Sequence, residues 1–134
     1  MKELSGLPFE LVMKFTSDKY DVINEDIFNA IGGVYAVFID SILKYVGVYS
    51  HTFQHRWVNK MKNKNCVRIE RHFKYHELAE MAGNQMVEVY ALTENKINDI
   101  FNTPFVNPVG IQYRLIKDYM PPLNKMQGHG YASK

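Results

Sequence analysis

Two short runs of strand-forming residues, separated by a two-residue turn signal, constrain the fold of this 134-residue chain more than any other feature. Residues 34–39 (VYAVFI) and residues 42–49 (ILKYVGVY) are rich in β-branched and aromatic side chains, which favour extended backbone. Asp40 and Ser41, which lie between the two runs, are turn formers. The sequence therefore predicts a β-hairpin over residues 34–49.

Helix signals stand on both sides of this hairpin. Asn24 is a suitable N-cap for a short helix over residues 25–31, which a pair of glycines ends. Apolar residues at helical spacing predict two more helices, over residues 52–63 and residues 72–82. Residues 9–15 (FELVMKF) are expected to pair as an edge strand.

The last third of the chain predicts one more strand and two helices. Residues 86–92 (MVEVYAL) alternate like a half-buried strand, and Thr93 is placed to cap a short helix after it. Asn107 as N-cap and Pro108 at the first helical position mark the start of the final helix. That helix is predicted to end near Tyr119, because two consecutive prolines follow.

These segments predict a single α/β (α+β) domain over residues 1–134, built as a small, mostly antiparallel three-stranded sheet flanked by helices. The core of the domain is expected over residues 32–125. Residues 1–31 are expected to form an N-terminal extension, and residues 126–134 a flexible tail.

The composition is that of an ordinary soluble globular protein, with 46% hydrophobic and 22% charged residues. No run approaches the roughly 18 apolar residues that a membrane helix needs. The single cysteine, Cys66, excludes an internal disulfide and a cysteine-rich zinc site. A reducing, cytoplasmic compartment is the expectation that follows.

Positive charge is concentrated in one segment. The formal net charge is only +2, yet residues 55–76 hold seven of the 16 Lys and Arg residues and a single acidic residue, Glu70. Such a basic stripe suggests a polyanion as partner, although a solvated basic helix has the same pattern. The basic residues of this segment are Arg56, Lys60, Lys62, Lys64, Arg68, Arg71 and Lys74.

Short motifs in a fixed order add a more specific indication. The tripeptide GVY at residues 33–35 is followed, after nine residues, by YVG at residues 45–47. Arg56 comes next in the context FQHRW, and the segment QYRLIKDYMPPLN closes the series. Over about residues 33–124 the chain resembles the GIY-YIG nuclease family, and the resemblance implies that family's fold. In the closing segment the residues that match the family pattern are Leu115, Ile116, Lys117, Tyr119, Pro121 and Asn124.

One departure from the family pattern falls at Gln112. The family carries a metal-binding glutamate at this position, three residues before the Leu-Ile pair and 12 before the asparagine. A carboxylate binds Mg²⁺ with a full negative charge, whereas an amide offers only a neutral oxygen. Glutamine keeps the shape and loses the charge. Two interpretations stay open: a glutamate replaced deliberately to silence cutting, or a natural protein that binds DNA without cutting it.

The resemblance implies a catalytic set of Tyr35, Tyr45, Arg56, Gln112 (as glutamate in the active form) and Asn124. Tyr35 is the implied general base, Tyr45 positions water or phosphate, and Arg56 is a forked donor to the scissile phosphate. Because a free tyrosine has a pKa near 10, nearby positive charge is needed for a base at neutral pH. A glutamate at position 112 would hold Mg²⁺, and Asn124 would pack or hydrogen-bond nearby.

The implied activity is Mg²⁺-dependent hydrolysis of double-stranded DNA. With one active site per chain, cutting both strands requires either two visits or a symmetric oligomer, and a homodimer or tetramer is expected. Two other function classes stay open: a naturally non-catalytic DNA-binding protein, and a protein-interaction module that binds an acidic partner. Each tyrosine taken alone is also typical of an ordinary core residue. The residues expected to contact DNA are Lys44, Gly47, His55, Lys60, Lys62, Lys64, Arg68 and Arg71.

Overall fold

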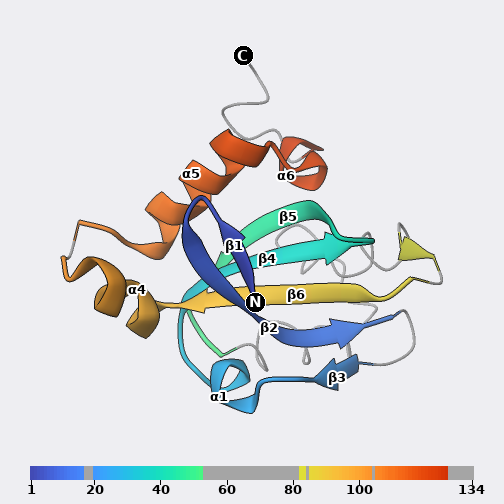
Figure 1. The fold of residues 1–134 in the computed structure, drawn as a ribbon, viewed down its shortest axis with the longest axis horizontal. Helices are drawn as coiled ribbons and strands as arrows, with labels where there is room; N and C mark the ends of the chain where they lie inside the picture. The colour runs from blue at the N-terminus through green and yellow to red at the C-terminus, as the bar shows by residue number, and fades with distance from the viewer. Residues whose placement is uncertain (17–19, 53–81, 84, 104, 127–134) are drawn as a thin grey trace.

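The computed structural model describes residues 1–16, 20–52, 82–83, 85–103 and 105–126 (Figure 1). Its architecture is mixed α+β, with a curled antiparallel sheet and a few helices. The helices predicted over residues 52–63 and 72–82 fall almost entirely outside the described residues. The basic segment over residues 55–76 lies outside them as well.

Six described strands form one sheet, in which every described pair of strands is antiparallel. The strand order is β1-β2-β6-β4-β5, and β3 pairs separately with β2. The strands are β1 (Lys2–Leu4), β2 (Leu7–Phe15), β3 (Tyr20–Val22), β4 (Gly33–Ile39), β5 (Ile42–Tyr49) and β6 (Val87–Thr93).

Helices follow the strands at the two ends of the chain. Three helices begin after an asparagine or threonine N-cap. The caps are Asn24 for α1 (Glu25–Phe28), Thr93 for α4 (Glu94–Phe101) and Asn107 for α5 (Pro108–Tyr119). Helix α6 (Pro122–Met126) follows α5 after a left-handed residue, Met120. All three caps confirm the sequence prediction, and α5 ends at the predicted residue.

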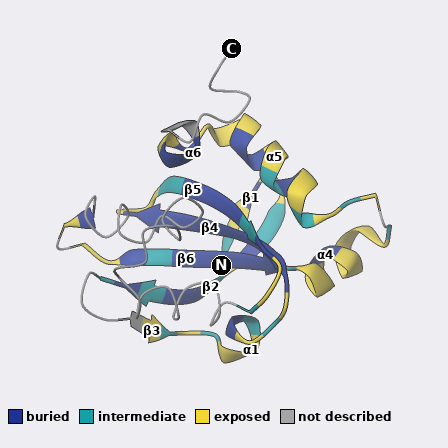
Figure 2. Ribbon diagram, turned by 180° about the vertical axis from the view of Figure 1, so that it is seen from behind, coloured by how far each residue is buried: buried dark blue, intermediate teal, exposed yellow. Residues whose placement is uncertain are grey.

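The sheet has two buried faces, and a different cluster of side chains packs on each. One face, here called the helix face, packs Val34, Ala36 and Val46 against α4 and α5 through Ile97, Ile111 and Leu115. The other, here called the tyrosine face, carries Tyr35, Tyr45 and Tyr49 together with Leu123 of α6. Figure 2 shows β4 buried along its length, β6 mostly buried, and many exposed residues on α4 and α5.

The β1–β2 hairpin folds over the helix face and reaches α5 (Figure 1). At its turn the Ser5 N–H donates to the Tyr119 hydroxyl at 2.8 Å, and the Ser5 hydroxyl donates to Asp118. At the start of the hairpin the Lys2 ammonium lies 5.0 Å from the centre of the Phe38 ring. The Ser5 contacts attach the β1–β2 hairpin to α5, and the Lys2 contact attaches it to β4.

The N-terminal part of the sequence prediction was wrong in two respects. The sheet has six described strands and not three, because residues 2–22 supply three of them. Residues 9–15 are not an edge strand, since β2 pairs with β6 on one side and with β1 and β3 elsewhere along its length. A bulge at Val12 interrupts the alternation of buried and exposed side chains along β2. A search for residues that alternate with a period of two therefore did not reveal that β2 is an interior strand.

The first helix is also shorter than predicted, since it ends at Phe28 and not at residue 31. The Asn29 N–H already closes the last turn by bonding to the Glu25 and Ile27 carbonyls. Gly32 then adopts a φ of 84°, and Gly33 belongs to β4. The glycine pair therefore begins the strand and does not end the helix.

The central hairpin confirms its prediction closely. Ile39 pairs with Ile42 across a two-residue turn, and Asp40 and Ser41 have φ values of 53° and 63°. Positive φ at both central residues is the geometry that matches the twist of paired strands. Within the described residues, no helix combines the length and the apolar character needed to cross a lipid bilayer.

Candidate functional site

Three tyrosines gather on the tyrosine face of the β4–β5 hairpin. The ring centroids of Tyr35 and Tyr45 lie 6.0 Å apart, and those of Tyr35 and Tyr49 lie 6.3 Å apart. Tyr35 and Tyr45, both members of the implied catalytic set, belong to the same buried cluster on this face. Their exposed fractions are 0% and 5%.

Gly47 lies directly across the hairpin from Tyr35. A Cβ atom on Gly47 would stand 2.5 Å from both Cζ and Oη of Tyr35. Real side chains do not approach this closely, so only glycine allows the tyrosine ring to cover the strand here. The YVG motif therefore has a steric reason within the fold, in addition to the phosphate approach that the resemblance implies.

Asn124 is fully buried against the backbone of Val46. Its side-chain oxygen accepts the Val46 N–H at 2.8 Å, and its nitrogen donates to the Val46 carbonyl at 2.8 Å. Among the described strands β5 pairs only with β4, so this amide bonds its outer edge much as another strand would. The proline pair that ends α5 turns the chain so that α6 brings Asn124 to this edge.

Gln112 reaches the same carbonyl from α5. Its Nε2 donates to the Val46 oxygen at 3.2 Å, and the side chain is half-buried. Val46 is the chain neighbour of both Tyr45 and Gly47. The structure thus brings Tyr45, Gly47, Gln112 and Asn124 together around the backbone of Val46, although Val46 and Asn124 lie 78 positions apart in the sequence.

The set of donors at this point does not fit a magnesium ion. Gln112 turns a nitrogen and not an oxygen toward the Val46 carbonyl, and Asn124 does the same. The described part of the chain holds no group of three or more His, Cys, Asp or Glu side chains close enough to hold a metal. Mg²⁺ needs oxygen ligands, and usually at least one carboxylate, so the residues present supply no site for it here.

Lys44 occupies a bulge in β5. Tyr45 pairs with Val37 and Leu43 pairs with Phe38, which leaves Lys44 as the extra residue between them. A bulge redirects the side chain of the strand that carries it. Lys44 is half-buried beside the tyrosine motif, but no described contact carries its charge to a tyrosine hydroxyl.

Tyr49 was not singled out as a site residue by the sequence analysis. Burial, and secondly the negative charge of Glu94, raise the pKa of Tyr49 above its ordinary value. Its hydroxyl is therefore protonated at neutral pH and is unsuited to act as a base. The available signal was its spacing from Tyr45, since residues four apart in a strand point to the same side.

Tyr49 and Glu94 also border a hollow of about 700 Å³ at the ends of β4 and β5. Gly32 allows Glu94 to lie there, since a Cβ on Gly32 would stand 3.3 Å from a Glu94 carboxylate oxygen. Asn107 and Pro108, at the start of α5, complete the wall. The hollow is open, and among the described residues that line it Glu94 is the one charged residue, which is too little charge to define a site.

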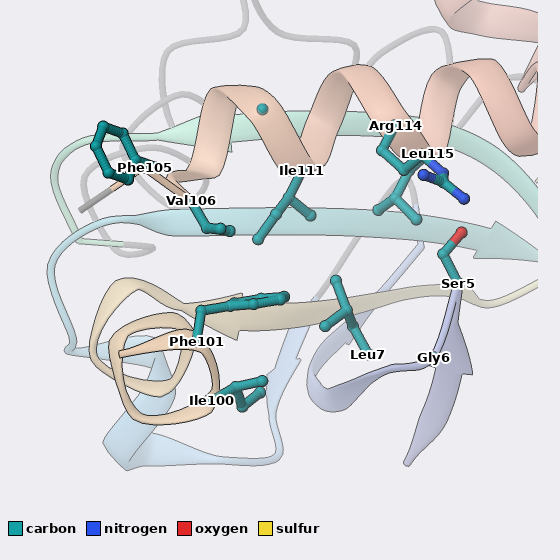
Figure 3. Close-up of a pocket in the computed structure, with 11 residues that line it drawn as sticks. Ser5, Gly6, Leu7, Ile100, Phe101, Phe105, Val106, Ile111, Arg114 and Leu115 are labelled. Atoms are coloured by element: carbon teal, nitrogen blue, oxygen red, sulfur yellow. The ribbon is translucent and has the colours of Figure 1, made fainter. Parts of the chain in front are cut away.

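A second pocket, of about 580 Å³, lies on the helix face (Figure 3). Its walls are mainly apolar, with Leu7 from β2, Phe101 from α4 and Ile111 from α5, and the Arg114 side chain lies at one end. The guanidinium of Arg114 is already paired with Asp118 at 2.8 Å. This pocket is separated by the sheet from the three tyrosines, so it does not belong to the candidate site.

Several predicted site residues fall outside the described part of the chain, and their relation to the tyrosines stays a prediction. They are the expected phosphate ligand Arg56 and the expected DNA contacts His55, Lys60, Lys62, Lys64, Arg68 and Arg71.

Comparisons of the chain with protein-family models, with curated proteins and with solved structures give no match in any of the three.

Proposed function

We propose that this chain is a DNA endonuclease domain of the GIY-YIG type, a phosphodiester hydrolase for double-stranded DNA whose cutting is impaired by Gln112. The observation that carries the proposal is the pairing of Tyr35 with Gly47 beside Tyr45, on one face of one hairpin. The motif residues occupy positions that depend on one another sterically. If the two tripeptides occurred by chance, we would not expect Tyr35 of the first to require a glycine at position 47 of the second.

The chemistry assigned to the tyrosines is proton transfer from water, assisted by nearby positive charge. A tyrosine has an ordinary pKa near 10, so the phenolate form that can take a proton from water is available at neutral pH only beside positive charge. Lys44, on its bulge next to Tyr45, and Arg56 are the candidate sources of that charge. Tyr49 stays protonated and is left to pack against Tyr35.

Binding to DNA is assigned to the basic segment over residues 55–76. Its excess of positive charge suits the phosphate backbone, and Arg56 has the planar donor geometry that matches a phosphate. We propose Mg²⁺ as cofactor of the cutting-competent form alone, which has Glu at position 112. A homodimer or tetramer on DNA belongs to the same proposal, and light scattering of the complex measures it.

The test is plasmid cutting by the full chain and its Gln112→Glu variant. With supercoiled plasmid and Mg²⁺ we expect nicked or linear product from Gln112→Glu and at least 100-fold less from the unchanged chain. Gln85→Glu is the matched control, because Gln85 is exposed and gains the same charge near the turn of the hairpin, away from Val46. If Gln112→Glu binds plasmid and leaves it intact, the endonuclease proposal fails.

A second candidate function is a DNA-binding protein that does not cut. The bonding of Gln112 to the Val46 carbonyl and the full burial of Tyr35 favour it, because both suit a structural role. This candidate predicts salt-sensitive DNA binding by both the unchanged chain and Gln112→Glu, with no cutting by either. A protein-interaction module with an acidic partner predicts no such DNA binding.

A further inference from the structure

We infer that Gln112 and Asn124 form an amide clamp on the Val46 peptide unit that holds the outer edge of β5 without a cation. In this chain Gln112 therefore acts as a positioning residue, through its bond to the Val46 carbonyl. The inference stands on the geometry of the clamp and does not require the proposed nuclease activity.

The hydrogen bonds of the clamp satisfy one another. The Val46 carbonyl oxygen has two lone pairs, and it receives one N–H from Asn124 at 2.8 Å and one from Gln112 at 3.2 Å. The Val46 N–H is bonded to the Asn124 oxygen at 2.8 Å. The backbone N–H and C=O of buried Val46 are thus both used on the side away from β4, and no ion is needed to satisfy them.

The clamp acts on the residues next to Val46. Side chains alternate along a strand, so fixing the Val46 peptide from the edge fixes the height and tilt of Tyr45 and Gly47 on the tyrosine face. Gly47 in turn sets the distance at which the Tyr35 ring covers the strand. Gln112 and Asn124 therefore position the tyrosine pair through the backbone of β5.

A glutamate at position 112 would replace the attractive hydrogen bond to the Val46 carbonyl with a repulsive contact. A carboxylate has no N–H, so it would place a charged acceptor against the Val46 carbonyl in place of a donor. Two oxygens facing each other at hydrogen-bond distance repel unless a cation or a proton lies between them. The same substitution that supplies a metal ligand therefore removes a structural bond, and it makes the local structure dependent on a cation.

Thermal unfolding of the full chain, with and without MgCl₂ at about 10 mM, tests this consequence. Without cation we expect Gln112→Glu to lower Tm by about 3–6 °C, the shift that one lost bond causes in a domain of this size. Mg²⁺ should restore most of that shift in Gln112→Glu and leave the unchanged chain and the Gln85→Glu control unaffected. Stabilisation of the unchanged chain by Mg²⁺ to the same degree would overturn the inference.

A second variant removes the donor without adding charge. Gln112→Met keeps the length of the side chain, and we expect it to speed hydrogen exchange of the Val46 amide about tenfold, with no response to Mg²⁺. An amide elsewhere in the hairpin, that of Ala36, serves as the internal reference. Unchanged exchange at Val46 in Gln112→Met would show that Gln112 is no part of the clamp, whatever the plasmid assay gives.

Discussion

The Tyr35 ring lies on the backbone of Gly47 across the β4–β5 hairpin, at a distance that leaves no room for even a methyl group. This contact links the two motif tripeptides physically. It also means that position 47 accepts a side chain only if the residue at position 35 becomes smaller or moves.

Gly47→Ala should therefore destabilise the fold. The new Cβ would stand 2.5 Å from Tyr35 Oη, and relieving that overlap moves a fully buried ring, at a cost of about 1–3 kcal/mol. Urea denaturation measures the change in unfolding free energy. Gly110→Ala is the control, because its nearest neighbour, Asn107 Oδ1, would lie 3.6 Å away and alanine favours a helix. Equal effects of the two substitutions would contradict the steric explanation.

The hydroxyls of Tyr35 and Tyr45 are tested by removing one oxygen atom from each. In the Gln112→Glu background we expect Tyr35→Phe to reduce plasmid cutting by at least 100-fold, and Tyr45→Phe by less, while DNA affinity stays within about twofold. The rings remain, so the fold is kept. Tyr113→Phe is the matched control, since Tyr113 is exposed on α5. Full cutting by Tyr35→Phe would remove Tyr35 from the role of general base.

The sequence predicted the elements whose signals are local. The hairpin was found because strand formers surround a turn of two residues, and α5 was found because Asn107 caps it and prolines follow it. These features involve neighbours in the chain, so no knowledge of the tertiary structure was needed.

The interior position of β2 and the clamp on Val46 were not predictable in this way. Strand β2 is buried because β6 pairs with it from more than 70 residues away in the sequence, and the bulge at Val12 obscured its pattern. The bond between Asn124 and Val46 spans 78 positions. From the sequence Gln112 was understood only through what the family carries there, and its bond to Val46 emerged from the fold.

Titration of Tyr49 should make the protein less stable in alkali. Its pKa is raised in the folded state, by burial first and by Glu94 second, so unfolding favours ionisation once the pH exceeds the unfolded value of 10.0. The stability is fully present below that pH and falls above it, by at most about 1.4 kcal/mol per pH unit for one group.

Urea midpoints measured between about pH 8 and pH 11 check this expectation. Tyr49→Phe should have a shallower alkaline decline than the unchanged chain, whereas Tyr113→Phe should not, since Tyr113 is exposed. Tyr90 also has a raised pKa, from burial and then from Glu88, but it titrates in both variants and so cancels in the comparison. Parallel declines for Tyr49→Phe and the unchanged chain would contradict the burial argument.

The N-cap of α5, Asn107, is expected to contribute to the free energy of unfolding. The Asn107 side chain accepts the Gly110 N–H at 2.9 Å, and loss of this bond in Asn107→Ala should cost about 1 kcal/mol of unfolding free energy. Asn107→Asp should restore most of it, because aspartate accepts the same bond and its charge suits a helix start. A loss of stability in Asn107→Asp as large as in Asn107→Ala would mean that the position acts through packing.

Electrostatic contact with DNA is the last expectation, and it rests on the basic segment. Lys60, Lys62 and Lys64 alternate with uncharged residues, and we expect their combined replacement by alanine to weaken binding to a short duplex by at least tenfold at about 100 mM salt. Each lost phosphate contact should also reduce the slope of log affinity against log salt by about 0.9. Replacement of Lys96 and Lys117 by alanine, on α4 and α5, is the control for general charge loss. A common slope for both variants would assign the DNA contact to net charge alone and remove the basic segment from the proposed interface.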